Sequence, residues 1–235
     1  MYGRLSVLAL GTFAIGTDSF VVAGILPQVA TSLEVSVGAA GQLVTVFALS
    51  YAVLSPVMAA VTAHWPRRRV LLGGLAVLVV GNALTATLPT FELVLASRAL
   101  AGLGAAMFTP TASGVAASLV PPAQRGRALA LVMAGLSGAT ALGAPIGTVI
   151  GSSGDWRTTM WFVAALAAVA FVGVAALLPV VATPPAVTLA QRLAPARDAR
   201  IALTLLTTVL VLTGLYTVYT YISVSYDRAT GGDGT

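Results

Sequence analysis

Seven long apolar segments divide the chain, and short polar connections separate them. The segments cover about 5–29, 38–62, 70–88, 92–118, 127–150, 157–180 and 201–224. Each holds about 19 to 27 residues, enough for a helix to cross the roughly 30 Å hydrocarbon core of a bilayer. None alternates with period two as a barrel strand does, and a helix satisfies its own backbone in lipid. The pattern predicts an all-α membrane protein whose first segment is retained, being long for a signal peptide.

The composition agrees with this prediction and excludes several classes of function. Of the 235 residues, 58% are hydrophobic and 8% are charged, whereas soluble domains hold about 25% charged residues. With no cysteine and one histidine, the chain offers no disulfide, no thiolate metal site and no imidazole zinc centre. It also lacks a lysine for a retinal Schiff base, a GxxxxGK[ST] loop for ATP, and a nucleophile–base arrangement. We therefore expect neither an enzyme nor a cofactor.

The arginines are unevenly distributed between the two sides of the predicted bundle. One side collects nine of them: Arg4, Arg67, Arg68, Arg69, Arg125, Arg127, Arg192, Arg197 and Arg200. The other side holds two arginines and most of the acids: Arg157, Arg228, Glu34, Glu92, Asp155, Asp227 and Asp233. By the positive-inside rule the N-terminus is cytoplasmic and the seventh span ends outside. We expect a multi-pass protein of the cell (plasma) membrane, and clusters placed this way do not indicate nucleic acid.

The only long connection divides six spans from one. We expect a six-helix half over 1–180, a cytoplasmic linker over 181–200 and the first helix of an incomplete C-terminal half over 201–235. A lone seventh helix looks unfinished, so we expect a coding sequence that was cut short or a remainder that was lost.

A weak internal repeat relates the first three spans to the next three. AVLSPVMAAV begins at Ala52 and is followed by Trp65 and arginines, while ALGAPIGTVI begins at Ala141 and is followed by Trp156 and Arg157. The offset is about 89 residues. Inverted three-helix repeats of this kind are the building units of many transporters.

Two ionisable residues, Asp18 and Arg98, lie well inside predicted spans. A charge at bilayer depth costs several kcal/mol, and such residues usually serve a function. Their distances from the outer span ends correspond to depths of roughly 13 Å and 9 Å, so the two side chains can share one cavity. Burial disfavours a carboxylate and a nearby cation favours it, so Asp18 is a candidate for reversible protonation with Arg98 setting its affinity. The alternative is a static ion pair that ties two helices together.

The surroundings of these charges predict an apolar pocket. Small residues, Ala101, Gly102 and Ala105, share a face with Arg98 and leave room for a cavity or a close helix. The face of Asp18 continues with apolar residues, which suits lipophilic substrates. Candidate aromatic walls of a substrate cavity are Phe20, Phe47, Tyr51 and Phe108, for which simple packing is the alternative.

A stripe of small residues runs along the fifth span. Its members are four residues apart: Gly135, Ala139, Gly143, Gly147 and Gly151. Such a face lets another helix approach closely, either as plain tight packing or as a seam that repacks during transport. Pro145 lies within the stripe and predicts a kink.

Three stretches of the chain carry specific motifs: GTDSFVVAGILPQVATSLEVSVGAAGQLVTVFALSYAVLSP at 16–56, SRALAGLGAA around Arg98, and LGAPIGT followed by DWR at 155–157. They resemble the major facilitator superfamily, and within it the drug:proton antiporters of the arabinose and chloramphenicol type. The resemblance implies a twelve-helix exporter that works by alternating access between two six-helix halves. It further implies that Arg98 belongs to the motif of the fourth span, and that Gly143, Pro145, Gly147, Arg67 and Arg68 form conformational motifs.

The sequence departs from this family in two respects. The loop motif usually begins with Gly and carries an Asp before its basic residues, but the aligned positions are Ala59 and Ala63. Without this Asp, the usual ionic contact between the loop and a helix is not expected. In addition, five of the twelve spans are missing, so transport by this chain needs a second half or a second copy.

The sequence therefore favours a proton-coupled exporter whose partners are a small-molecule substrate, protons and the lipid bilayer. Alternatives are a sugar or nucleoside exporter of the same superfamily, a non-transporting fragment or assembly partner, and a seven-helix receptor. The repeat and the cytoplasmic N-terminus disfavour the receptor. The oligomeric state stays open.

Overall fold

The computed structural model of the chain describes residues 2–179, 181 and 188–229. It divides into two compact units, Met1–Ala186 and Val187–Thr235. Within the described ranges all regular structure is helical. Part of the predicted linker, 182–187, and Asp233 lie outside the described residues, as do the side chains of Arg192, Asp227 and Arg228.

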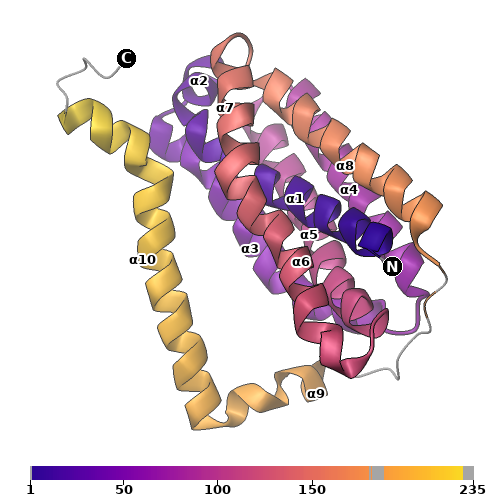
Figure 1. The fold of residues 1–235 in the computed structure, drawn as a ribbon. Helices are drawn as coiled ribbons and strands as arrows, with labels where there is room; N and C mark the ends of the chain where they lie inside the picture. Colours follow the sequence, from indigo (N-terminus) through magenta and orange to yellow (C-terminus); the bar gives the residue numbers. More distant parts are fainter. Residues whose placement is uncertain (1, 180, 182–187, 230–235) are drawn as a thin grey trace. The chain divides into compact units, whose positions relative to one another are not determined.

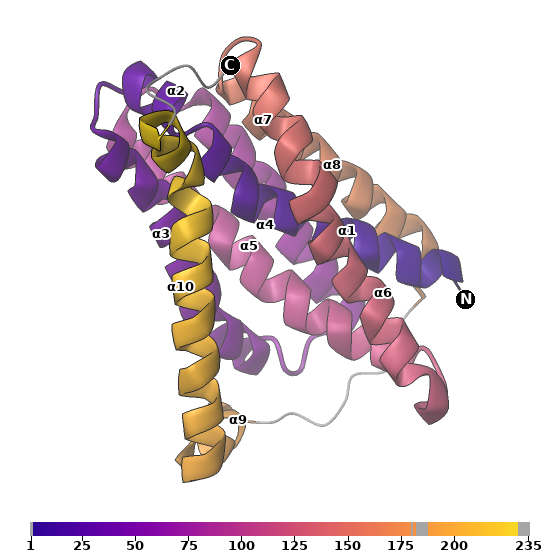
Figure 2. The same ribbon diagram turned by 60° about the vertical axis from the view of Figure 1, so that its left-hand side comes forward.

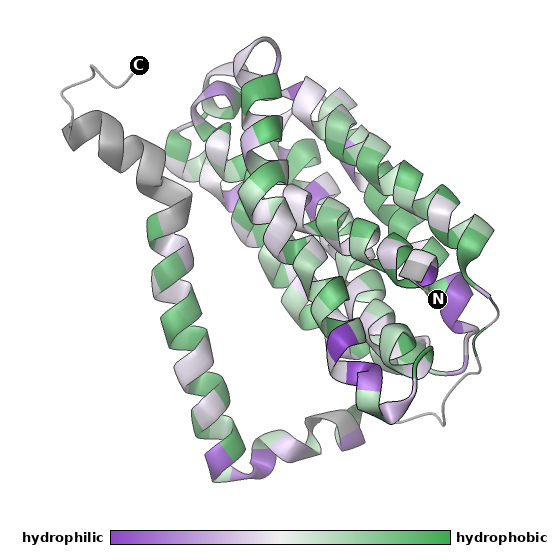
Figure 3. Cartoon of the chain, viewed as in Figure 1, coloured by the Kyte–Doolittle hydropathy of each residue, from purple (hydrophilic) through white to green (hydrophobic). Residues whose placement is uncertain are grey.

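The first unit is a bundle of six apolar spans (Figures 1 and 2). In chain order its elements are α1 (Tyr2–Gly24), α2 (Leu26–Ser32), α3 (Val37–Val61), α4 (Arg67–Thr87), α5 (Phe91–Ser118), η1 (Pro122–Gln124), α6 (Arg125–Gly138), η2 (Ala139–Gly143), α7 (Ala144–Ser152) and α8 (Arg157–Leu177). The most extensive contacts join α4 to α5, α3 to α5, α4 to α8, and α1 to α6. Hydrophobic residues cover most of these helices along their length (Figure 3). Over the whole described chain seven helices are long and apolar enough to cross a membrane, which confirms the seven predicted spans.

Two of the predicted spans are not single α-helices. The first breaks at Ile25 (φ −118°), and α2 begins with Pro27 in its first turn, where the missing proline N–H has no partner to lose. The fifth contains the π-helical turn η2 directly before Pro145. Proline cannot donate to the carbonyl four residues earlier, and a local widening of the helix accommodates this loss. The kink expected at Pro145 therefore corresponds to a π-helical turn on its N-terminal side.

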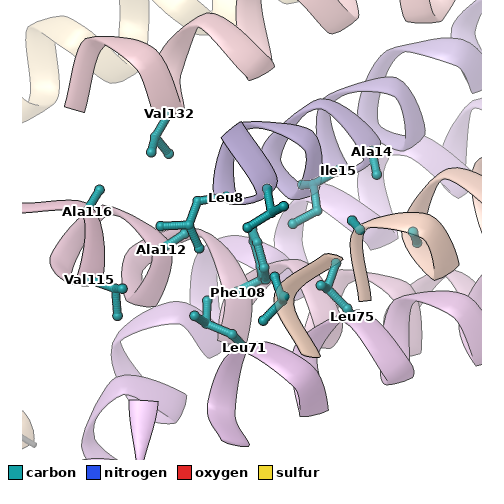
Figure 4. Packing of buried hydrophobic residues seen from close by; sticks show 14 of the residues in the cluster. Leu8, Ala14, Ile15, Leu71, Leu75, Phe108, Ala112, Val115, Ala116 and Val132 are labelled. Carbon is teal, nitrogen blue, oxygen red and sulfur yellow. The ribbon is translucent and has the colours of Figure 1, made fainter. Parts of the chain in front are cut away.

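An apolar core holds α1, α4 and α5 together (Figure 4). Phe108 on α5 lies at its centre with Leu8, Leu71 and Leu75, and its side chain is fully buried. A Cβ atom on Gly11 of α1 would collide with the Phe108 ring. Phe108 therefore packs between helices in this structure, as the alternative interpretation of the aromatic residues allowed.

The small-residue stripe of the fifth span packs against α1. Cβ atoms built on its glycines would collide with Ala9 and Thr12 at Gly135, with Thr17 at Gly143 and with Val21 at Gly147. Where α1 meets α6, the Thr12 hydroxyl donates to the Val132 carbonyl oxygen at 2.7 Å. The sequence predicted a close helix contact, and the structure identifies α1 as the partner.

We expect Gly135→Ala to destabilise the bundle by about 1–3 kcal/mol, the usual cost of overpacking. The added methyl group would meet the backbone oxygen of Ala9, which cannot move aside as a flexible side chain can. Thermal unfolding in detergent, followed by circular dichroism, measures the effect. Gly114→Ala on α5 is the matched control because Gly114 is exposed and nothing lies within 4 Å of its added Cβ. Equal midpoints for the two variants would contradict the tight seam.

The second unit consists of α9 (Leu189–Leu193), η3 (Ala194–Arg197) and α10 (Ala199–Ala229). A capping box starts α9: the amide N–H of Gln191 donates to the hydroxyl of Thr188, and the N–H of Thr188 donates to the side chain of Gln191. Over Ala199–Val218 the helix α10 is apolar and no residue is buried within the unit. A helix that is hydrophobic on all sides requires an apolar environment, which agrees with a seventh span.

Candidate functional site

Asp18 and Arg98 meet in the interior of the first unit. Asp18 lies on α1 and Arg98 on α5, and Arg98 Nη1 donates to Asp18 Oδ1 at 2.6 Å. Arg98 Nη2 also donates to the backbone carbonyl oxygen of Asp18 at 3.3 Å. The side chains are 0% and 1% exposed, so the pair is closed to solvent in this conformation. A buried charge pair of this kind depends on its hydrogen bonds, because desolvation offsets much of the Coulomb attraction.

Asn82 on α4 completes the hydrogen bonding of this pair. Its Nδ2 donates to Asp18 Oδ2 at 3.1 Å and to the Leu78 carbonyl oxygen at 3.1 Å. Its Oδ1 accepts a long hydrogen bond of 3.5 Å from Arg98 Nη1. Sequence reasoning missed Asn82, although it is the only asparagine of the chain and lies within an apolar span. The site therefore joins three helices, α1, α4 and α5.

Phe47 connects the ion pair to α3. The Arg98 guanidinium lies 4.7 Å from the centre of the Phe47 ring, within the range of a cation–π interaction. Phe47 is buried and packs edge-on against the half-buried Tyr51, with 6.2 Å between ring centres. The helices approach closely here because a Cβ on Gly102 would lie 2.6 Å from the Phe47 carbonyl oxygen. The small residues beside Arg98 were expected to leave room either for a cavity or for a closely packed helix. At Gly102 the structure shows a closely packed helix, α3.

The four predicted aromatic residues have different surroundings. Phe47 lies beside the ion pair, and Tyr51 packs against Phe47. Phe47 and Phe108 both belong to the apolar core. Phe20 follows Asp18 on α1 and is half-buried.

The residues of the predicted conformational motifs contact helix α1 and backbone carbonyl groups. Gly143 and Gly147 contact Thr17 and Val21 of α1. On α4, Arg67 Nη2 donates to the Ala63 carbonyl oxygen at 3.2 Å. Arg68 Nη2 donates to the Ala175 carbonyl oxygen at the end of α8. Both arginines therefore donate to backbone carbonyl oxygens. Ala63, at the position where the family motif has Asp, offers no carboxylate to them.

A family model described as the Major Facilitator Superfamily matches residues 8–231. A chloramphenicol resistance protein of Streptomyces lividans is 36% identical over 234 residues, covering 97% of this chain and 60% of that protein. The MFS-type transporter YbcL of Bacillus subtilis, named as uncharacterized, is 33% identical over 220 residues, covering 94% of this chain and 56% of that protein.

The fold also resembles solved structures. A crystal structure of the peptide transporter POT in complex with sulfate has a TM-score of 0.67 at 17% identity and covers 94% of this chain and 49% of that one. At this identity the likeness shows the fold alone. The chain spans little more than half the length of the curated relatives described above.

Proposed function

This chain belongs to the major facilitator superfamily, and we propose that it contributes the N-terminal half of a proton-coupled antiporter that exports small lipophilic compounds. The buried contact between Asp18 and Arg98 is the observation that carries this proposal. It is the only ion pair with both side chains buried among the described residues, and it joins helices that are far apart in sequence. Ionisable residues enclosed in a membrane bundle are by default functional.

In the proposed cycle a proton adds to the carboxylate of Asp18 from the outer side and leaves to the cytoplasm. Protonation removes the charge that holds Arg98 Nη1 at 2.6 Å and weakens the connection between α1 and α5. A proton drives such a change only if it binds two conformations with different affinity. The close pair represents the deprotonated state, and the substrate leaves to the outside in exchange for the proton that enters the cytoplasm.

The substrate class is supported by the side chains near the pair and by a relative. On α3, the ring of Phe47 contacts both the guanidinium of Arg98 and the ring of Tyr51. On α1, Phe20 lies two residues beyond Asp18. Aromatic surface next to one buried acid suits neutral or cationic lipophilic compounds. The relative from Streptomyces lividans is named for chloramphenicol resistance, so chloramphenicol is the first compound to test.

The proposed orientation places the N-terminus in the cytoplasm. Its support is the excess of arginine on one side of the first unit, which includes the start of α4 and the start of α6. Cytoplasmic loops carry such an excess because translocating arginine is unfavourable.

Everted membrane vesicles that contain the protein together with a second half or a second copy test this function. An acidic lumen should drive uptake of radiolabelled chloramphenicol, and an ionophore that dissipates the pH gradient should abolish the uptake. Arabinose in a parallel assay tests the sugar exporter. Chloramphenicol uptake that survives loss of the gradient would contradict proton coupling, and uptake of arabinose alone would contradict the lipophilic substrate.

A further inference from the structure

Helices α4 and α8 are joined at both ends by arginine side chains that donate to backbone oxygens of the other helix. Arg68, in the first turn of α4, donates from Nη2 to the carbonyl oxygen of Ala175 near the end of α8. Arg157, the first residue of α8, donates from Nη1 to the carbonyl oxygens of Ala86 at 3.2 Å and Leu88 at 2.8 Å, at the end of α4. The two helices are therefore antiparallel neighbours. In each, an arginine in the first turn is hydrogen-bonded to the last turn of the other.

The internal repeat relates these contacts to each other. Arg68 and Arg157 are 89 residues apart, and so are Ala86 and Ala175. Within each helix, eighteen residues separate the arginine from the accepting alanine. Eighteen residues make five turns of 3.6 residues, so donor and acceptor lie on one face. The same face of each repeat thus carries a donor at one end and an acceptor at the other.

The accepting carbonyl groups need an external donor. The last carbonyls of a helix have no intrahelical partner, and the cap amides of Leu88 and Leu178 donate to Leu84 and Val174 respectively. Proline follows both caps, at Pro89 and Pro179, and supplies no N–H group. A cationic donor near a helix C-terminus also interacts favourably with the helix dipole.

The environment of Arg157 adds to its placement. Its guanidinium carbon lies 4.8 Å from the centre of the Trp156 ring, and its Nε lies 3.9 Å from Asp155 Oδ2. Asp155 is 58% exposed, so this exposed ion pair contributes little stability. The backbone oxygens at the end of α4 are the part-buried partners of the arginine.

We propose that Arg68 and Arg157 form two repeat-related clamps that hold α4 and α8 together as one rigid pair, one clamp at each membrane surface. The clamps use backbone oxygens and therefore work without the loop carboxylate that Ala63 replaces. Their value for transport rests on the proposed function, because a half that moves as a body must not separate at its helix ends. The contacts themselves are testable without any transport.

Spin-label distances test each clamp separately, since the chain has no cysteine of its own. One pair, Arg69→Cys with Leu177→Cys, reports on the end held by Arg68. The other, Thr87→Cys with Thr158→Cys, reports on the end held by Arg157. All four positions are exposed. Double electron–electron resonance on the full chain in lipid nanodiscs measures both distances.

Arg68→Ala should replace the narrow distance of the first pair by a broad distribution and leave the second pair narrow. Arg157→Ala should do the reverse, and the unaffected end shows that the protein is folded. Arg125→Ala removes an exposed charge at the start of α6 and should change neither pair. If an alanine variant does not insert, the corresponding glutamine variant, which keeps an N–H donor, should retain a narrow distance. Unchanged distances in both alanine variants, broadening in Arg125→Ala, or broadening in the glutamine variant would overturn the proposal.

Discussion

Replacing Asp18 with asparagine is expected to reduce pH-driven transport to the level of vesicles without the protein. Asparagine is close in shape to aspartate but cannot exchange a proton. Asparagine leaves the guanidinium of Arg98 without a charged partner, but the bundle should stay folded, because Arg98 keeps the backbone oxygen of Asp18 and the ring of Phe47 as partners. An amide oxygen at position 18 can also accept the hydrogen bond of Arg98 Nη1. Uptake of radiolabelled chloramphenicol into everted vesicles under a pH gradient measures the loss.

The matched control for this variant is Asp198→Asn. Asp198 is exposed, and its Oδ1 accepts the amide N–H of Arg200 at 2.8 Å at the start of α10. Asparagine caps helices as well as aspartate does, so transport should be unchanged. Full pH-driven transport by Asp18→Asn, with normal expression, would rule out the proton role of Asp18.

Removing Arg98 is expected to be the most destabilising single change in the first unit. Arg98→Ala leaves the carboxylate of Asp18, 0% exposed, with Asn82 as its remaining side-chain donor. Breaking a buried ion pair on one side costs about 3–5 kcal/mol, and the cation–π contact with Phe47 is lost as well. The midpoint of thermal unfolding in detergent should fall accordingly.

Neutralising the remaining carboxylate should recover part of this loss. The double variant Asp18→Asn with Arg98→Ala should unfold at a higher temperature than Arg98→Ala alone, because no unpaired charge stays buried. Acidification should have the same effect on Arg98→Ala, since a protonated carboxyl group is neutral. An Arg98→Ala variant as stable as the parent chain would show that the ion pair does not hold α1 to α5.

The two charged residues could be found from the sequence because charge within an apolar span is rare and costly. Their depths along the helices also predicted that they could meet. Rotation about the helix axis could not be predicted in the same way. Membrane helices are apolar on the side that faces lipid as well as on the side that faces other helices, so hydropathy does not mark the inner face.

This limit explains what sequence reasoning missed at the site. Phe47 and Phe108 were both predicted as cavity walls, and both are buried in one apolar cluster, where Phe47 also covers the guanidinium of Arg98. Asn82 carries no charge and was overlooked, although a single amide inside an apolar span is itself a signal. The partners of Arg157 could not be predicted, because a carbonyl acceptor leaves no trace in a sequence.

The helix breaks were predictable in part. Pro145 indicated a disturbance in the fifth span, but its form, the π-helical turn Ala139–Gly143, depends on how the stripe of small residues meets α1. The break at Ile25 was not expected from an apolar segment of uniform character. Pro27 is its local sign, because proline favours the first turn of a new helix.

The protonation of Asp18 is the central claim, and infrared difference spectroscopy tests it most directly. Spectra of the purified chain are recorded between acidic and alkaline buffers, with Asp18→Asn as the reference that removes the signal of this one group. If Asp18 takes up a proton, the carbonyl stretch of a protonated carboxyl group appears on acidification and is absent from the variant. A carboxylate signal from Asp18 that persists across the entire pH range would contradict it.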